Sequence, residues 1–539
     1  MRPFPDAPFA ITTTPPSLAW RRRLTAALRS SLIWRYLICY LIACYLVYCF
    51  VFSMPLFASP LRAYSGPYPV GAIDIEVPLP TPRVVDAARF KGTGENAFAL
   101  QSVLFTLYYP ASSDGDAASQ RRPLHDWIPR PISATAEGYA KFAHINNFLT
   151  KAIFTGALRA LVGGIKIPAS VDVPLAGDPS STSPTGSESS YEEAEGEAEK
   201  VLRLRIERNN NVYPVVIFSH GMASSRTDYT HYAGELASRG YVVAMLEHRD
   251  GSCPGSVLVS DDEPDQVRLT FRMSEVESAD GRDLTIDEFQ SAQLNFREAE
   301  IEEAARVLQL INSGRGDDVF QQNTRDEGSD LANWAGRLDT DEMVVAGHSY
   351  GATGALQALR GGPSPARPFK GAIILDPGKQ SGRLNDDIHV PVLVVHSNSW
   401  SSTHSLFYGR PHFDTVRGLA EANNARGHAS WFATSLGTSH PSVSDAPLLE
   451  PLLLRWTTGA KIDVYEGLRQ YVHVSEDFLR FLADGRKRNL LAERAEFPEY
   501  DEGWGFGMWK PGQGESADEK GPWFDWRKYW QVHVSAAHR

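Results

Sequence analysis

Residues 343–354 read MVVAGHSYGATG, an apolar run that passes directly into the pentapeptide GHSYG at 347–351 and then into small residues. This order predicts a buried strand, a sharp turn and a helix, the context of a nucleophile elbow. Glycines on both sides of the serine let strand and helix pack closely, and the turn lifts the hydroxyl to a helix N-terminus that favours negative charge. Ser349 is therefore the predicted nucleophile. A chance match in a loop is the alternative, which the flanking pattern disfavours.

Other apolar runs extend this pattern on both sides. Strands are predicted at 102–109, 215–218, 241–246, 343–346, 372–375 and 392–395, and helices at 227–239, 289–312 and 350–360. Short apolar strands that alternate with helices predict a mostly parallel sheet with helices on both faces, an α/β-hydrolase fold. In such a sheet the site lies beyond the carboxyl ends of the strands.

The loop after 215–218 begins Ser-His-Gly-Met and is the predicted oxyanion loop. We expect the backbone N–H of Met222 to join that of Tyr350 in holding an oxyanion, and one such donor is typically worth about 100- to 1,000-fold in turnover. His220 lies in the same loop. We interpret it as a structural histidine that shapes the loop, and not as the general base.

A serine needs a base and an orienting acid, which follow it in the order Ser, acid, His. The strand at 372–375 ends directly in Asp376, whereas the next strand end carries no carboxylate, so Asp376 is favoured over Asp386 and Asp387. Among the downstream histidines, His440 lies in a small-residue loop suited to presenting an imidazole. His428 is its rival.

Composition excludes several functional classes. A formal charge of -12 without a clustered basic footprint argues against nucleic-acid binding. The four cysteines form no spacing typical of zinc, and three of them, Cys39, Cys44 and Cys49, lie in one apolar run. We expect no metal and no cofactor.

An uncharged apolar run extends from Tyr36 to Phe57. At about 1.5 Å per residue it is long enough to cross a bilayer core of about 30 Å, and we expect a single-pass anchor. Arginines gather on its N-terminal side, which predicts a cytoplasmic N-terminus. A cleaved signal peptide and an internal core helix are the alternatives, and the arginine-rich leader leaves a mitochondrial inner-membrane placement open.

The predicted organisation follows from these segments. The chain begins with a disordered basic leader (1–35), the membrane helix (36–57) and a linker (58–98). The catalytic domain follows (99–485) and carries a Ser/Pro/Glu-rich insertion (174–200). An aromatic-rich extension (486–539) comes last.

Residues 143–162 place apolar side chains at helical spacing, with Lys151 and Arg159 between them. Packing of this helix on the sheet is the simpler interpretation. A lipid-facing helix is the alternative.

Several of these motifs resemble one family. The stretch YPVVIFSHGMASSRTDYTHYAGELASRGYVVAMLEHRD, from Tyr213 to Asp250, is similar to the platelet-activating factor acetylhydrolases of the plasma and intracellular type II kind, and so are Trp127-Ile128-Pro129, GHSYG and the segment from Gly437 to Asp445. The resemblance covers about 100–170 and 210–485. Asp376 is followed by Pro377, where the family has Ala-Trp.

The resemblance implies a function and a site. The family's triad falls on Ser349, Asp376 and His440, and its oxyanion donors on Met222 and Tyr350. It implies calcium-independent hydrolysis of short or oxidised sn-2 acyl esters of phospholipids by a membrane-bound, fungal-type relative. A general carboxylesterase, a lipid acyltransferase and a membrane-anchored interaction protein with an inactive hydrolase domain are the alternatives. The sequence predicts no oligomeric state.

Overall fold

The computed structural model describes residues 34, 36–45, 47–48, 58–112, 122–145, 147–177, 212–259, 264–450, 457–503 and 526–536. The chain divides into two units, Met1–Leu56 and Phe57–Arg539.

The first unit contains most of the predicted membrane span. Residues 36–45 and 47–48 are helical. Across the described part of the chain, no helix combines the length and the apolar character that a membrane span requires. The rest of the predicted span, residues 46 and 49–57, lies outside the described residues, as do residues 1–33 and most of the insertion, 178–200. The anchor therefore stays a prediction.

The second unit is built on one mixed sheet, which has twelve strands among the described residues, in the order β16-β15-β12-β11-β10-β5-β6-β2-β1-β4-β3 with β9 beside β1. The central strands are parallel to one another: β15 (Ser430–Ser435), β12 (Val392–Ser397), β11 (Phe369–Leu375), β10 (Leu338–His348), β5 (Tyr213–Ser219) and β6 (Val242–Leu246). Their side chains are almost wholly buried, as the continuous apolar runs predict.

Antiparallel strands flank this parallel centre, so the sheet is less uniformly parallel than the sequence predicts. They are β1 (Val70–Phe90), β2 (Asn96–Pro110), β3 (Leu124–Asp126), β9 (Val276–Glu277) and β16 (Trp530–Val534), with β4 (Lys166–Ser170) parallel to β1 and antiparallel to β3. The C-terminal strand β16 pairs with β15 and thereby covers an edge of the sheet. Part of the C-terminal extension thus belongs to the same sheet as the elbow.

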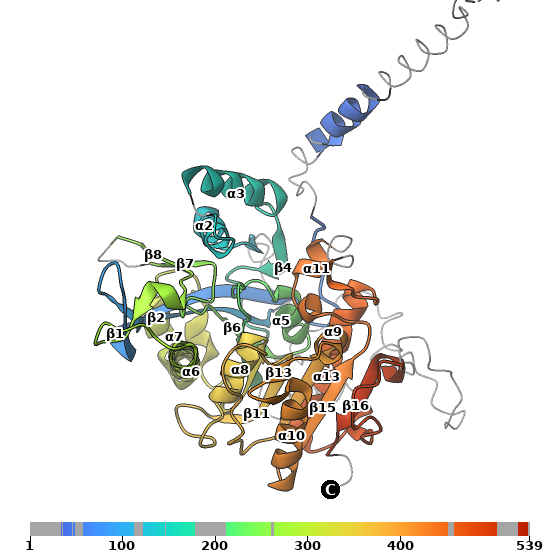
Figure 1. Cartoon of the computed structure of the whole chain (residues 1–539). Helices are drawn as coiled ribbons and strands as arrows, with labels where there is room; N and C mark the ends of the chain where they lie inside the picture. The colour runs from blue at the N-terminus through green and yellow to red at the C-terminus, as the bar shows by residue number, and fades with distance from the viewer. Residues whose placement is uncertain are drawn as a thin grey trace, which may run out of the picture. The chain divides into compact units, whose positions relative to one another are not determined.

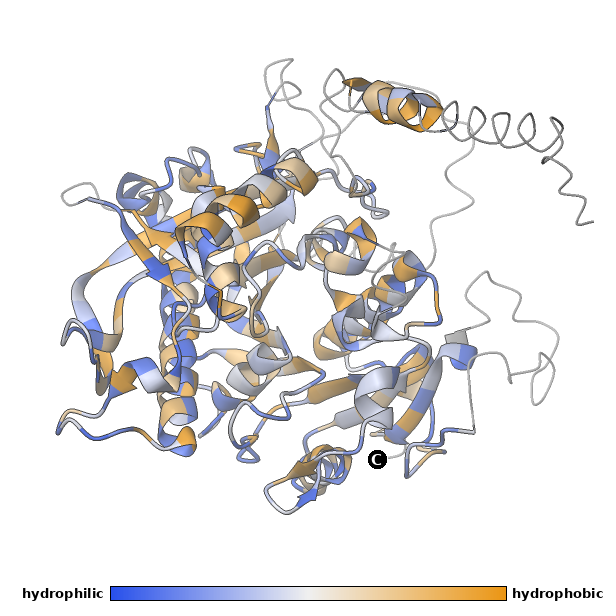
Figure 2. Cartoon of the chain, turned by 45° about the horizontal axis from the view of Figure 1, so that its top comes forward, coloured by the Kyte–Doolittle hydropathy of each residue, from blue (hydrophilic) through white to orange (hydrophobic). Residues whose placement is uncertain are grey.

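Two separate groups of helices pack on this sheet (Figure 1). One group is α5 (Thr230–Ala237) with α13 (Val464–Asp484), and the other is α6 (Ile286–Leu310) with α8 (Tyr350–Gln357). Figure 2 shows helices that carry both hydrophobic and hydrophilic residues, which is typical of helices with one face on a core. Helices α5 and α8 are buried along almost their whole length. A parallel centre with helices packed on it, and an elbow after a central strand, fit an α/β-hydrolase fold.

Shorter elements complete this unit. The remaining helices are α2 (Ile132–Phe142), α3 (Phe148–Leu161), α7 (Gly316–Gln322), α9 (Asn398–Ser402), α10 (His412–Ala425) and α11 (Ala446–Leu449), and the hairpins are β7 (Gly255–Leu258) with β8 (Gln266–Leu269) and β13 (Leu406–Phe407) with β14 (Arg410–Pro411).

Helix α3 packs against α2 at one end of this unit (Figure 1). None of its described side chains is buried, and the ring of Phe148 is 90% exposed. The interpretation of residues 143–162 as a helix buried on the sheet is therefore wrong.

Candidate active site

The turn between β10 and α8 holds Ser349 in a strained backbone conformation, with φ 57° and ψ -121°. The glycines around it are required by space. A Cβ atom at Gly347 would lie 2.3 Å from the carbonyl oxygen of Gly351, and a Cβ atom at Gly351 would lie 1.9 Å from that of Ser219. The backbones of β10, α8 and the end of β5 are therefore in direct contact at these glycines. Ser349 lies at the N-terminus of α8.

Asp376 lies at the carboxyl end of β11, beside the elbow. The backbone N–H of Ser349 donates to the carbonyl of Leu375, the residue before Asp376, at 2.9 Å. The carboxylate is buried and accepts from the backbone N–H of Ser397 at 2.6 Å and from the Ser397 hydroxyl at 2.7 Å. These donors fix the direction of the carboxylate oxygens.

His440 completes a pair with this carboxylate. Its Nδ1 lies 2.8 Å from Oδ2 of Asp376, and its side chain is 29% exposed, against 2% for the acid. A proton on Nδ1 that is donated to the carboxylate leaves Nε2 free to accept one, which is the state that a general base requires. The partly exposed imidazole next to a buried acid can therefore activate a hydroxyl.

Asp445 holds the loop that carries His440. It accepts from the backbone and hydroxyl of Thr230 and from the backbone N–H of His231, at the start of α5. It also accepts from the indole N–H of Trp127 at 3.0 Å. The His440 backbone N–H donates to the hydroxyl of Ser399 at 2.9 Å. The imidazole is thus positioned from both α5 and α9.

Two rings lie close to the His440 imidazole. The indole of Trp400 is stacked on it, with ring centroids 3.9 Å apart and 11° between the planes. The ring of His348 lies 4.4 Å from it, tilted by 37°. Trp400 is itself fixed, because its Nε1–H donates to the carbonyl of Pro377 at 3.0 Å.

The predicted oxyanion loop lies directly against the elbow. A Cβ atom added at Gly221 would be 3.1 Å from the Cβ of Ser349. The side chain of Met222 is 46% exposed, and no hydrogen bond of the described residues uses its backbone N–H. The N–H of Tyr350 is the first of α8 and has no partner within that helix. Both N–H groups suit an oxyanion beside Ser349.

His220 does not face the triad as a base would. Its Nδ1 lies 2.8 Å from the carbonyl of Gly221, and its Nε2 accepts the backbone N–H of His248 at 3.1 Å. Burial and the positive charge of Arg297 lower the pKa of His220 to about 4. A neutral ring with both nitrogens engaged holds the loop, in agreement with its interpretation as a structural histidine.

A buried polar network supports the loop from behind. Arg297 of α6 pairs with Asp250 at 2.8 Å and donates to the carbonyl of His220 at 2.7 Å. His248 lies 2.7 Å from the hydroxyl of Ser219 and 2.5 Å from Glu300. Burial raises the pKa of Glu300 well above its usual range and lowers that of His248. Because these groups satisfy one another away from water, the loop has a rigid base.

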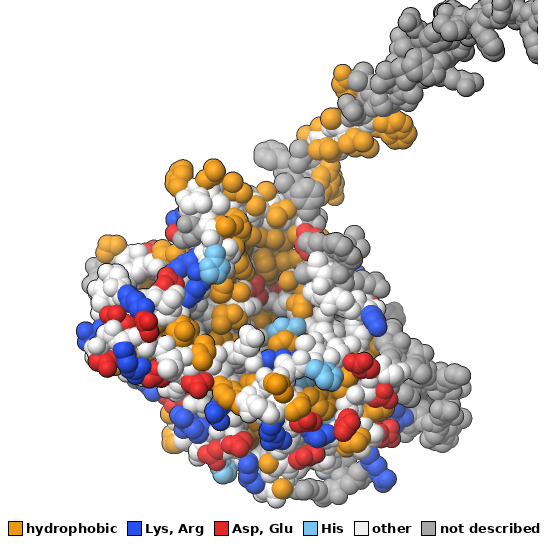
Figure 3. Space-filling view, viewed as in Figure 1, with side chains coloured by type: hydrophobic (Ala, Val, Ile, Leu, Met, Phe, Trp, Pro, Cys, Tyr) orange, Lys and Arg blue, Asp and Glu red, His pale blue; other side chains and the backbone are white. Residues whose placement is uncertain are grey.

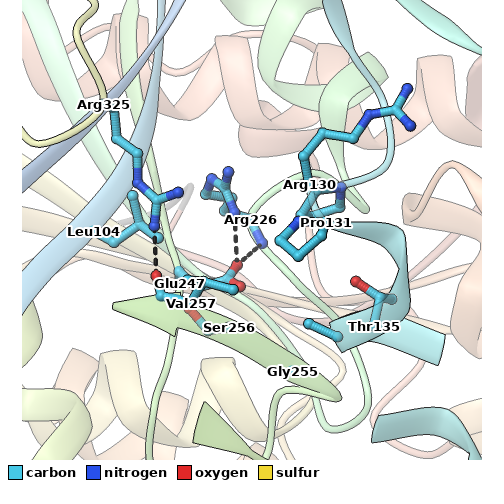
Figure 4. A pocket seen from close by; sticks show the side chains of 12 residues that line it. Leu104, Arg130, Pro131, Thr135, Arg226, Glu247, Gly255, Ser256, Val257 and Arg325 are labelled. Atoms are coloured by element: carbon cyan, nitrogen blue, oxygen red, sulfur yellow. Dashed lines mark hydrogen bonds and ion pairs between the residues drawn. The ribbon is translucent and has the colours of Figure 1, made fainter. Parts of the chain in front are cut away.

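A small polar pocket is lined by Arg226, Glu247 and Arg325, and none of Ser349, Asp376 and His440 lines it. Figure 4 shows Arg226 and Glu247 facing each other in it, with Arg325 donating to the backbone of Val257. Arg226 is also paired with Asp74 at 2.6 Å. Both arginines thus have partners: Arg226 pairs with carboxylates and Arg325 donates to a backbone carbonyl. We therefore assign these side chains to the support of the fold.

The alternative acids and the alternative histidine lie elsewhere. Asp386 and Asp387 are exposed and precede the N-terminal end of β12, and His428 precedes that of β15. Asp387 bonds the imidazole of His389 at 2.7 Å. Because β11, β12 and β15 are parallel, these residues lie at the opposite end of the sheet from Asp376 and His440.

Comparisons with known proteins identify the family of this chain. The family model described as platelet-activating factor acetylhydrolase, isoform II, matches residues 190–493, more than half of the chain. The chain belongs to this family.

Relatives of this acetylhydrolase family differ in how much of their length is matched. A putative phospholipase A2 of Schizosaccharomyces pombe is 26% identical over 78% of this chain and 91% of its own. The platelet-activating factor acetylhydrolase of Cavia porcellus is 25% identical over 63% of this chain and 60% of its own, and that of Canis lupus familiaris is 30% identical over 31% and 36%. A ferulic acid esterase from Streptomyces cinnamoneus aligns with a TM-score of 0.41 at 16% identity, over 81% of this chain and 97% of its own.

One group of side chains in this family member has the composition of a metal site. Within the described ranges, the donor atoms of His348, Asp376 and His440 form the one group of three that lie within 4.8 Å of one another. The Asp376 carboxylate is already bonded to Ser397 and His440, and Nδ1 of His348 is bonded to Tyr229. We therefore assign Asp376 and His440 to the candidate triad, with His348 as a neighbouring side chain, and not to a metal site.

Sequence reasoning missed several residues of this site. Ser397, Trp400 and Tyr229 contact triad residues or their neighbours. Ser397 ends β12 and Trp400 lies in the α9 helix that follows, whereas Tyr229 lies directly before α5. The segment from 396 to 400 contains no carboxylate, and its sequence alone indicates no role in the site. Its position at the end of a buried strand was the available signal, since side chains at strand ends meet at one edge of a parallel sheet.

Proposed function

We propose that this chain is a serine-dependent, calcium-independent esterase that hydrolyses the sn-2 acetyl or short or oxidised acyl ester of phospholipids. The observation that carries the proposal is the 2.8 Å contact between Nδ1 of His440 and Asp376, beside the strained Ser349. Family membership and a relative named as a putative phospholipase A2 support an ester bond in a phospholipid as the target.

The mechanism that we propose has two acyl-transfer steps. His440 takes the proton of the Ser349 hydroxyl on Nε2 while Asp376 holds its Nδ1–H and stabilises the charged ring. Ser349 attacks the ester carbonyl, and the backbone N–H groups of Met222 and Tyr350 hold the oxyanion. His440 then returns the proton to the leaving alcohol. Water, activated by the same imidazole, releases the acid and restores the serine.

Serine dependence is tested by covalent labelling. A fluorophosphonate probe should label the wild-type chain and not Ser349→Ala. Ser329→Ala, which changes an exposed serine of another loop, is the matched control and should label normally. Labelling that survives in Ser349→Ala would contradict the assigned nucleophile. A wild-type chain that does not label would favour the inactive interaction protein.

Substrate class is tested by product analysis on a phospholipid panel. The proposal expects lysophospholipid and free acid from short sn-2 chains, with little product from long ones. Equal rates on simple carboxylic esters would favour a general carboxylesterase, and transfer of the acyl group to an added lipid alcohol would favour an acyltransferase. Rates that EDTA leaves unchanged are expected, because the proposed step uses protein groups alone.

We further propose that residues 36–57 anchor the chain in a membrane with the N-terminus on the cytoplasmic side. The uncharged run and the arginines before it support this placement. Carbonate extraction should leave the full chain with the membrane fraction, and a chain with Leu41 and Leu46 changed to Glu should be released. Release of the wild-type chain would contradict the anchor.

A further inference from the structure

His348 has a place in the site that the proposed mechanism does not use. It is buried immediately before Ser349, and its ring lies 4.4 Å from that of His440. Its Nε2 lies 4.0 Å from Oδ2 of Asp376, the oxygen that His440 contacts at 2.8 Å. Two imidazoles thus approach one carboxylate oxygen.

The hydroxyl of Tyr229 lies between the oxyanion loop and one ring nitrogen of His348. Its hydroxyl oxygen accepts the backbone N–H of Gly221 at 3.3 Å and lies 2.8 Å from Nδ1 of His348. Because the oxygen already accepts from Gly221, its O–H is available to donate to Nδ1, and the ring proton then sits on Nε2. The opposite tautomer would point a lone pair at the Asp376 carboxylate, which is unfavourable in a buried site.

The environment keeps this ring neutral. Burial, and then the neighbouring His440, lower the pKa of His348 well below its usual range. A backbone hydrogen bond to His440 opposes this shift, and the described residues offer its Nε2 no side-chain partner within hydrogen-bond distance. A neutral N–H that faces a carboxylate at 4.0 Å attracts it without competing for the proton that His440 must take.

We propose that His348 is a positioning residue, a second imidazole that fixes the relative positions of Asp376 and His440. The hydroxyl of Tyr229 links this imidazole to the oxyanion loop. The inference rests on the proposed function. One hydrogen-bonded path runs from Gly221, which precedes the proposed donor Met222, through Tyr229 to His348. The two halves of the site, the oxyanion loop and the acid–base pair, are thereby joined through one hydroxyl.

The arrangement also confines the catalytic imidazole. His440 has Trp400 stacked at 3.9 Å and His348 at 4.4 Å. A ring with neighbours at these distances has little freedom to turn about its Cβ–Cγ bond, so the direction of its Nε2 is fixed. Loss of such positioning lowers turnover more than substrate binding, because a small displacement of the base affects the transition state.

The test compares His348→Leu with His348→Gln. The glutamine amide can place an N–H near the position of Nε2, whereas leucine fills the space without a donor. We expect His348→Leu to lower kcat on a soluble short-chain ester by about 10- to 100-fold with KM within about twofold. His348→Gln should recover most of that loss. Equal losses in both variants, or a loss in KM alone, would overturn the proposal in favour of simple packing.

Tyr229→Phe tests the link to the oxyanion loop, and Tyr232→Phe is its matched control. Tyr232 is equally buried, and its hydroxyl bonds Ser475 at 2.8 Å between α5 and α13. Tyr229→Phe should lower kcat by about 10-fold, and Tyr232→Phe should leave kcat of the folded enzyme unchanged. Equal kcat in the two variants would contradict the link.

The rate of fluorophosphonate labelling separates this inference from the proposed function. Labelling requires the activated serine and no phospholipid. Slow labelling of His348→Leu with fast labelling of wild type supports the positioning role, whichever ester proves to be the substrate. A wild-type chain that does not label at Ser349 would overturn the proposed function and the positioning role with it.

Discussion

The imidazole of His440 lies flat against the indole of Trp400, with centroids 3.9 Å apart and 11° between the ring planes. The Nζ of Lys379 lies over the Trp400 ring, 4.5 Å from its centroid. Burial lowers the pKa of Lys379 to about 8, although Asp376 opposes this shift. Asp376 is followed by Pro377, and an indole from α9 lies beside the candidate acid–base pair.

Trp400→Ala should therefore lower kcat by about 10- to 100-fold, because the imidazole loses the flat surface that fixes its orientation. Trp400→Phe keeps a flat ring and should retain most of the activity. Steady-state kinetics on a soluble ester, with the melting temperature of each variant, would separate this effect from unfolding. Full activity in Trp400→Ala would show that the stacked ring has no positioning effect.

Asp376→Asn should abolish most of the turnover. An amide in place of the carboxylate stabilises the wrong tautomer of His440, and the equivalent change in a serine protease triad costs about 10,000-fold in kcat. Asp387→Asn is the matched control, since Asp387 is exposed at the opposite end of the sheet. Comparable losses of kcat in both variants would contradict the assignment of Asp376 as the acid and favour Asp386 or Asp387.

The glycines of the elbow should differ in their tolerance of a methyl group. A Cβ at Gly351 would meet the backbone oxygen of Ser219 at 1.9 Å, whereas at Gly354 the nearest atom would be a side-chain carbon of Arg297 at 3.3 Å. Gly351→Ala should fail to accumulate as folded protein, and Gly354→Ala should fold with a melting temperature within a few degrees of wild type. Circular dichroism melts would measure both. A stable Gly351→Ala variant would contradict this packing of strand and helix.

Stability should fall as the pH rises through the range in which Asp477 ionises. Burial raises the pKa of Asp477 to about 7. Between pH about 4 and about 7 the folded chain keeps a proton that the unfolded chain has released, so a rising pH favours unfolding.

Asp477→Asn removes this ionisation and keeps a polar partner for Asn489, which donates to Asp477 at 3.0 Å. The variant should be more stable than wild type at pH about 8, by up to a few kcal/mol, and similar to it at pH about 4. Urea denaturation at the two pH values would measure the difference. A constant difference across this range would mean that Asp477 does not titrate there.

Helix α3 offers a test of contact with lipid. Its apolar side chains Phe148, Leu149 and Ile153 are exposed, and Figure 3 shows hydrophobic side chains gathered over this end of the unit. Phe148→Glu should lower the rate on vesicle-bound phospholipid by about 10-fold and leave the rate on a soluble ester unchanged. Ile286→Glu is the control, because it makes the same kind of apolar-to-Glu change at an exposed residue of another helix, α6. Unchanged vesicle rates in Phe148→Glu would exclude α3 from lipid contact.

The local parts of this molecule could be predicted from the sequence, because their causes are local. The strands at 343–346 and 372–375 are continuous apolar runs, which only a buried parallel strand accommodates. Ser349 follows one of them within a glycine-flanked turn, and Asp376 follows the other. Neighbouring parallel strands end at one edge of a sheet, so the serine and this acid were placed together by pattern alone.

Tertiary structure decided what local pattern leaves open. The position of His440, and not His428, next to Asp376 depends on Asp445 tying its loop to α5, more than two hundred residues earlier in the chain. The pairing of β16 with β15 and the exposure of α3 also depend on contacts between distant segments. The spacing of apolar residues along a helix is the same whether its apolar face packs on a core or stays exposed. Only the packing of the folded chain distinguishes these two cases. The stacked Trp400 and the Tyr229–His348 contact were decided in the same way, by side chains that meet only when the loops fold together.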